Sequence, residues 1–161
     1  MAYENIIAFV GKNSSIRYYD ITTGTFGDTG AQGSCPSIYG NIIAFSSGGT
    51  IHYYDLSTQT LVDTGINGSD PAIYEDIIAF ESHSRIQLYD LCSGTVVDLG
   101  IIGNEPALYE NLVAFATQEY LAEQDLNRDG DIVDTVIRYY DINTGKLFNT
   151  GEIGYLPAIY G

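Results

Sequence analysis

The chain has 161 residues, of which 45% are apolar, so it is long and hydrophobic enough to fold around a core rather than remain disordered. Its 21 acidic and six basic residues give a net charge of −15, which disfavours nucleic acid and anionic membranes as partners but favours cations. No apolar run is long enough to span a membrane, and the N-terminal segment lacks the basic region of a signal peptide.

Four copies of one unit make up the chain. The sequence NIIAF at Asn5–Phe9 returns at Asn41–Phe45 and, with changes, at Asp76–Phe80 and Asn111–Phe115. Three further markers recur after it in the same order, as in IRYYD, DTG and PAIY. The sequence therefore predicts one domain of four repeats, with approximate boundaries 3–38, 39–73, 74–108 and 109–161.

Each repeat predicts four short strands. The markers PSIYG, IIAF and IRYYD and the segment ending in DTG supply one strand each, and the short apolar run IIAF is typical of a strand covered on both faces. The third and fourth strands are joined by Asp-x-x-Thr-Gly turns, in which the aspartate can accept backbone hydrogen bonds and the glycine can adopt a positive φ. Gln59 replaces this glycine once, so its turn is expected to be strained or of another type.

Tandem four-stranded repeats of this length are typical of β-propellers. The pattern PAIYGNIIAF followed by IRYYDINTG resembles the blades of TolB-like and WD40-like propellers over the whole chain. This resemblance implies an all-β propeller of four-stranded antiparallel blades. Three arrangements remain open: a closed four-bladed ring, an eight-bladed ring made by a homodimer, and a fragment of a longer propeller. In the first two, the C-terminal PAIY segment would complete the first blade.

The fourth repeat carries an insertion between its second and third strands, from Phe115 to Ile137, which contains DLNRDGDIVD. Acids at alternate positions around a glycine are typical of loops that wrap Ca²⁺. The predicted metal ligands are Asp125, Asn127, Asp129, Asp131 and Asp134, with Glu119 and Glu123 in reserve and Gly130 at the sharp turn. The segment resembles the calcium loops of dockerins and integrin-type blades, but Val136 stands where an EF-hand has its twelfth-position acid. The alternative is an acidic solvent loop.

Other motifs favour architecture over chemistry. DTG at Asp28 and Asp63 resembles the aspartic-protease signature, yet it recurs in every repeat at a fixed position, which predicts a strand end and turn. His52 and His83 have no zinc-site spacing, and the repeated tyrosines are expected to pack between blades. Cys35 and Cys92 do not favour a disulfide.

The sequence thus predicts a non-catalytic binding or scaffold propeller with a calcium-ordered loop, in an extracellular or cell-surface setting where a modest calcium site can fill. The alternatives are a carbohydrate-binding propeller, which would expose tyrosines beside acids, and a hydrolase or lyase that uses the propeller axis. The protein or carbohydrate ligand is not specified by any motif.

Overall fold

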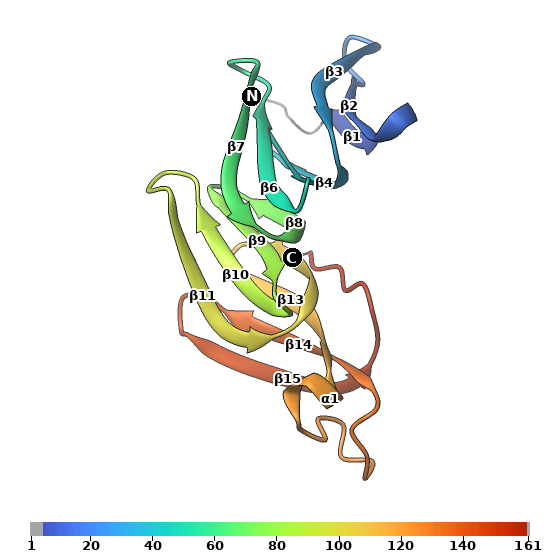
Figure 1. Ribbon diagram of the computed structural model, residues 1–161, viewed down its shortest axis with the longest axis vertical. Helices are drawn as coiled ribbons and strands as arrows, with labels where there is room; N and C mark the ends of the chain where they lie inside the picture. The colour runs from blue at the N-terminus through green and yellow to red at the C-terminus, as the bar shows by residue number, and fades with distance from the viewer. Residues whose placement is uncertain (1–4, 161) are drawn as a thin grey trace. The chain divides into compact units, whose positions relative to one another are not determined.

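The computed structural model describes residues 5–160, and almost all of its regular structure is β-strand (Figure 1). Fifteen strands run through this part of the chain, with only a three-residue turn η1 (Lys12–Ser14) and a four-residue helix α1 (Glu119–Ala122) of helical character. Every strand pair whose register is resolved is antiparallel, which confirms the predicted fold class.

The strands follow the four repeats. They are β1 (Ile6–Val10), β2 (Ser15–Asp20) and β3 (Thr25–Gln32); β4 (Ser34–Tyr39), β5 (Ile42–Ser47), β6 (Thr50–Asp55) and β7 (Thr60–Asn67); β8 (Ser69–Tyr74), β9 (Ile77–Ser82), β10 (Arg85–Asp90) and β11 (Thr95–Ile102); and β12 (Asn104–Tyr109), β13 (Leu112–Gln118), β14 (Thr135–Asp141) and β15 (Lys146–Ile153). The last three groups form four-stranded sheets in chain order, while β1, β2 and β3 form a three-stranded sheet.

The chain divides into two compact units, which meet in the sequence at Glu75 and Asp76. The first unit has a core around Ile16, Ile43, Phe45 and Tyr54. In the second unit the fully buried side chains include Phe80 and Phe115. The IIAF strands supply much of both cores, as expected for short apolar strands covered on both faces.

The Asp-x-x-Thr-Gly turns form as predicted. Asp20 Oδ1 accepts the backbone N–H of Thr22 at 2.8 Å and of Thr23 at 3.2 Å, and the aspartates of the other three repeats bond their turns in the same way. The glycine at the end of this turn has φ near +70° in three repeats. Gln59 takes φ +55° in the second repeat, so the turn keeps its type and Gln59 has the left-handed backbone conformation that glycine adopts more readily.

The tyrosines pack partly as expected. Tyr18 of the first repeat lies against Tyr54 of the second, with ring centroids 6.3 Å apart. Tyr19 instead contacts Phe26 of its own repeat at 4.7 Å. Aromatic packing therefore joins neighbouring repeats in the first unit and also stiffens single hairpins.

Candidate metal centre

The inserted loop projects from the hairpin of β13 and β14. The two strands stay paired as far as Gln118 and Thr135, and the backbone N–H of Glu119 donates to the carbonyl of Asp134 at 2.9 Å. The loop proper therefore comprises residues 119–134, within the longer insertion predicted from the sequence. Because both strands continue to its base, the loop starts from a rigid support.

Glu119 lies at the centre of this loop, and its side chain is fully buried. Its Oε1 accepts the backbone N–H of Leu126 at 2.6 Å and of Asn127 at 3.1 Å, and its Oε2 accepts that of Asp134 at 3.2 Å. A buried carboxylate is costly unless it is compensated, and three backbone donors compensate this one. Glu119 therefore ties together the start, middle and end of the loop.

Asn127 joins two of the predicted ligands. Its Nδ2 donates to Asp129 Oδ2 and to Asp134 Oδ2, both at 3.0 Å, and its Oδ1 accepts the backbone N–H of Asp129 at 3.1 Å. The amide group carries the partial positive charge that lies between these two carboxylates. To bind a cation between Asp129 and Asp134, the Asn127 side-chain amide would have to flip so that its Oδ1 replaces its Nδ2.

Asp125 and Gly130 shape the turn. Asp125 accepts backbone hydrogen bonds from Arg128 at 2.5 Å and from Gly130 at 3.1 Å. Gly130 has φ +105°, which fits the sharp turn predicted for it. In this geometry Asp125 acts on the loop backbone, as an Asx turn does.

Three carboxylates converge in the loop. One oxygen from each of Glu119, Asp131 and Asp134 lies within 4.8 Å of the other two. Partial burial, together with the adjacent Asp129 carboxyl, raises the pKa of Asp134. The backbone N–H of Asp131 and the amide of Asn127 lower the pKa of Asp129. A cation would relieve this crowding of negative charge, as a shared proton does at lower pH.

The sequence placed Glu119 only in reserve, although it is the most deeply buried acid of the group. Its position directly after the last residue of β13 was the available signal, because a residue at a strand end is held more firmly than one within a loop. The donor set is made of carboxylate and amide oxygens, which suits a hard ion such as Ca²⁺. A flexible loop favours Ca²⁺ over Mg²⁺, since Mg²⁺ demands near-octahedral geometry.

The far part of the loop is anchored to the neighbouring strand. Leu126 is buried, and its carbonyl accepts the side-chain Nδ2 of Asn149 in β15 at 2.7 Å. Asn149 replaces the aspartate found at this position in the other three repeats. An amide can donate this bond whereas a carboxylate cannot, so the repeat that carries the insertion also carries the side chain that holds it.

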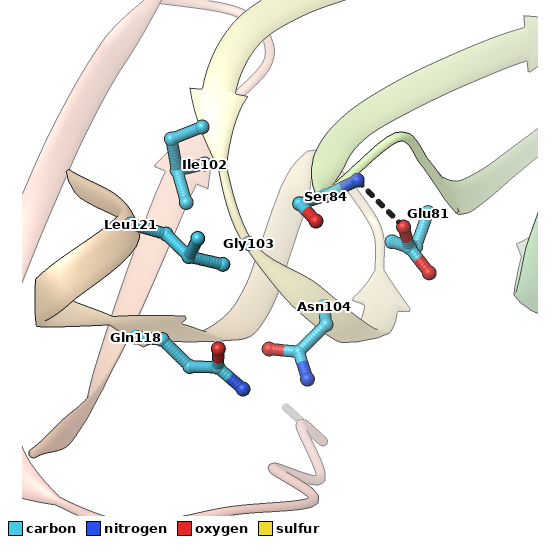
Figure 2. A pocket seen from close by; sticks show the side chains of 7 residues that line it. All are labelled: Glu81, Ser84, Ile102, Gly103, Asn104, Gln118 and Leu121. Carbon is cyan, nitrogen blue, oxygen red and sulfur yellow. Dashed lines mark hydrogen bonds between the residues drawn. The ribbon is translucent and has the colours of Figure 1, made fainter.

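A small cavity lies beside the loop in the second unit. Figure 2 shows the seven residues that line it, which are Glu81, Ser84, Ile102, Gly103, Asn104, Gln118 and Leu121. Its volume is about 150 Å³, below the range of sites that enclose small-molecule ligands. The Glu81 carboxylate accepts the backbone N–H of Ser84 at 2.7 Å (Figure 2).

The DTG segments serve the fold. Asp28 and Asp63 each accept the backbone N–H of the glycine two residues later at 2.8 Å, where the strand bulges. Asp28 also lies 3.7 Å from Arg17, and Asp63 lies 3.6 Å from His52. Each aspartate is engaged within its own hairpin, which supports the architectural interpretation over a protease dyad.

The remaining sequence candidates are dispersed. Cys35 and Cys92 are exposed free thiols. His83 lies in the turn between β9 and β10, where its Nδ1 contacts Ser82 at 3.0 Å. Exposed tyrosines in the described part of the chain include Tyr120 in the inserted loop and Tyr155 near the C-terminus.

A second hollow, of about 460 Å³, lies in the first unit. Tyr18 and Asp20 line it together with Asn5 and Leu56. It is the one of the two hollows that combines a tyrosine with an acid, although Tyr18 is only partly exposed and the carbohydrate-binding alternative requires exposed tyrosines.

Comparison with solved structures shows the class of fold. The chain is similar to a chain of the mitotic checkpoint complex, with a TM-score of 0.61, 10% identity and 88% of this chain covered. It is similar to Hsv2 from Kluyveromyces lactis, with a TM-score of 0.61, 16% identity and 89% covered. Both are WD40-like β-propellers, so the chain has a β-propeller-type fold built of four-stranded antiparallel sheets.

A third similar structure is the extracellular domain of BT4673 from B. thetaiotaomicron, with a TM-score of 0.61, 11% identity and 96% of this chain covered. The chain spans 45% and 46% of the first two proteins and 22% of the third. No family model matches the chain, and no curated protein matches it. Among residues 5–160, no helix has the length and apolar character needed to cross a membrane.

Proposed function

We propose that the chain is a non-catalytic binding or scaffold module of β-propeller type whose fourth repeat carries a Ca²⁺-ordered surface loop. The observation that carries this proposal is the convergence of Glu119, Asp131 and Asp134 within 4.8 Å at the base of the loop. Asp129 and the Asn127 amide oxygen complete an all-oxygen donor set. The ion orders the loop and thereby presents a defined surface to a protein or carbohydrate ligand.

The loop is suited to this role because its backbone is held by groups of the protein itself. Glu119 already fixes three backbone N–H groups, and the hairpin fixes both loop ends. Binding therefore has to reorient side chains more than backbone, which lowers the ordering cost. A site of modest affinity fits an extracellular setting, where free Ca²⁺ is high. The strongly acidic composition further supports a cationic partner over nucleic acid or a membrane.

Calorimetric titration of the full chain with CaCl₂, and with MgCl₂ for comparison, tests the proposal. We expect binding of one Ca²⁺ and an increase in Tm of about 5–10 °C at a hundredfold excess over Kd. Asp134→Asn should weaken binding at least tenfold. Asp98→Asn is the matched control, because Asn149 fills the equivalent position in the fourth repeat. An unchanged Tm with CaCl₂ and with EDTA would refute the metal site.

The pH dependence gives an independent reading of the same site. The pKa of Asp134 is raised, so this carboxyl holds its proton to a higher pH than an ordinary aspartate. Protons therefore compete with Ca²⁺, and affinity should decline as the pH falls towards this raised pKa. An affinity that is constant between pH 7 and pH 4 would exclude Asp134 as a ligand.

A carbohydrate-binding role is a second candidate, and the larger hollow of the first unit favours it. Tyr18 and Asp20 both line it, and the Asp20 carboxylate is an acceptor for sugar hydroxyls. Glycan-array screening of the native chain beside a Tyr18→Ala variant tests it. Loss of a signal in the variant would support sugar binding, and absence of any signal for the native chain would remove this candidate.

A further inference from the structure

Among residues 5–160, one edge of the apolar strand of the first repeat has no strand partner. In the second and fourth repeats the equivalent strands, β5 and β13, pair on both sides. In the part of the chain that the structure describes, β1 pairs with β2 alone. Unpaired strand edges are ready sites for another strand.

Side chains of β1 are also less buried than their counterparts in the later repeats. Ile7 in β1 is 50% exposed, whereas its counterparts Ile43, Ile78 and Val113 are fully buried. Phe9 is half-buried, while the equivalent phenylalanines of the later repeats are fully buried. The first repeat therefore presents an apolar strip that the other repeats cover.

In the later repeats the apolar strand is covered by the first strand of the repeat, and the sequence of that first strand occurs once more near the C-terminus. Pro157–Tyr160 has the sequence PAIY, identical to Pro71–Tyr74 in β8 and close to its counterparts in β4 and β12. It belongs to no sheet in the described chain. Leu156, which precedes it, has φ +50°, the same left-handed conformation as Cys35, Asp70 and Glu105 at the equivalent positions. The segment thus already has the backbone bend of a first strand.

One ring contact of this segment has a counterpart in a first strand. Tyr160 lies against Tyr109 of β12 with ring centroids 5.7 Å apart, as Tyr74 of β8 lies against Tyr39 of β4 at 4.5 Å. The Glu105 carboxylate accepts the backbone N–H of Leu156 at 2.9 Å. The ring contact and the backbone bend at Leu156 therefore place the segment relative to β12 as β8 is placed relative to β4.

Gly154 lacks a neighbour that the equivalent glycines have. A Cβ on Gly33 would lie 2.8 Å from the ring of Phe45, and one on Gly103 would lie 2.5 Å from the ring of Phe115. In both cases the ring belongs to the following repeat. A Cβ on Gly154 would meet only Ile137 of its own repeat. The place of the following phenylalanine is open beside Gly154.

We propose that Gly154–Tyr160 of one copy pairs with β1 of a second copy, so that two chains complete each other's blades in a ring. The registers of the second and fourth repeats place Ala158 opposite Ala8, Ile159 opposite Ile7 and Tyr160 opposite Ile6. Phe9 of the second copy would then cover Gly154. This proposal rests on the repeat geometry and is independent of the calcium site.

A second copy is the proposed occupant, because each copy carries both the apolar strip of β1 and the PAIY segment that would cover it. A reciprocal exchange between two copies would give two identical joints related by a twofold axis. Each joint covers Ile7 and Tyr160, of which Tyr160 is 92% exposed in one chain.

Disulfide trapping on the full chain tests the joint. In a Cys35→Ser, Cys92→Ser background, Ile7→Cys and Ile159→Cys place thiols at directly opposed positions, a separation that a disulfide spans. After mild oxidation, we expect covalent species of at least twice the 17.5 kDa chain on non-reducing gels. Mixing the two single variants should give a covalent heterodimer.

Ile7→Cys with Ala158→Cys is the matched control, because successive side chains point to opposite faces of a strand. It should crosslink at least tenfold more slowly. A disulfide confined to single chains would overturn the proposal in favour of closure within one molecule, and absence of any disulfide would overturn it altogether. Sedimentation of the unmodified chain as a monomer at 100 µM, roughly the upper range for a weak complex, would do the same.

Discussion

Replacing Glu119 with alanine should loosen the inserted loop without unfolding the sheets. The side chain is fully buried and accepts three backbone N–H groups, at 2.6, 3.1 and 3.2 Å. A buried donor left without a partner costs about 1–3 kcal/mol. The N–H of Leu126 is buried, while Asn127 and Asp134 are partly accessible to water, so we expect a loss of about 2–4 kcal/mol in local stability.

Native-state hydrogen exchange measures this loss where it occurs. The amides of Leu126, Asn127 and Asp134 should exchange about 30- to 1,000-fold faster in Glu119→Ala, while the amides of β13 and β14 keep their protection. Glu123→Ala is the matched control, since it removes an exposed acid in the same loop. A change below fivefold at all three amides in Glu119→Ala would refute the view that this carboxylate holds the loop together.

Three further predictions concern the framework. Gln59→Gly should stabilise the chain by about 0.5–1 kcal/mol in urea unfolding, because φ +55° suits glycine. Gly94→Gln should destabilise it by a similar amount. Variants as stable as the native chain would contradict this reasoning. Burial opposes ionisation of Asp55, but hydrogen bonds from its turn outweigh this effect and lower the pKa of Asp55 to about 2. Ionised Asp55 therefore stabilises the folded chain fully above pH 4, and this stabilisation is lost as the pH falls to 2. The stability deficit of Asp55→Asn should therefore vanish in acid, and a deficit that persists at pH 2 would argue against ionic stabilisation. Gly103→Ala should cost about 1–3 kcal/mol, because its Cβ would lie 2.5 Å from the ring of Phe115, and an unchanged Tm would contradict that contact.

The repeats made the fold predictable from the sequence. Recurrent spacing placed every strand type, and the Asp-x-x-Thr-Gly signature predicted hydrogen bonds that the structure contains. The sequence did not decide how Gln59 is accommodated, because only the tertiary context reveals that the neighbouring strands impose the turn. The repeat also decided between a protease dyad and a structural turn for Asp28 and Asp63, since a residue that recurs at the same position of every repeat usually has a structural role.

The inserted loop was less predictable because no second copy constrains it. Alternation of acids marked Asp129, Asp131 and Asp134 as candidates, and the structure brings them close to Asn127 or Glu119. Alternation could not reveal that Asp125 accepts hydrogen bonds from the loop backbone. It also could not rank Glu119 first, since burial depends on how the loop folds back over the strand end.

The inserted loop has few ties to the rest of the molecule. Its two ends meet through the Glu119 to Asp134 backbone hydrogen bond, its interior is organised by one of its own side chains, and Asn149 supplies an anchor on a neighbouring strand. Such a segment can be moved to another hairpin as one unit. Residues 119–134 could be transplanted to the tip of the hairpin of β9 and β10, with Asp98 changed to asparagine as the new anchor, which would give an engineered repeat array a second, independently placed loop of the same kind.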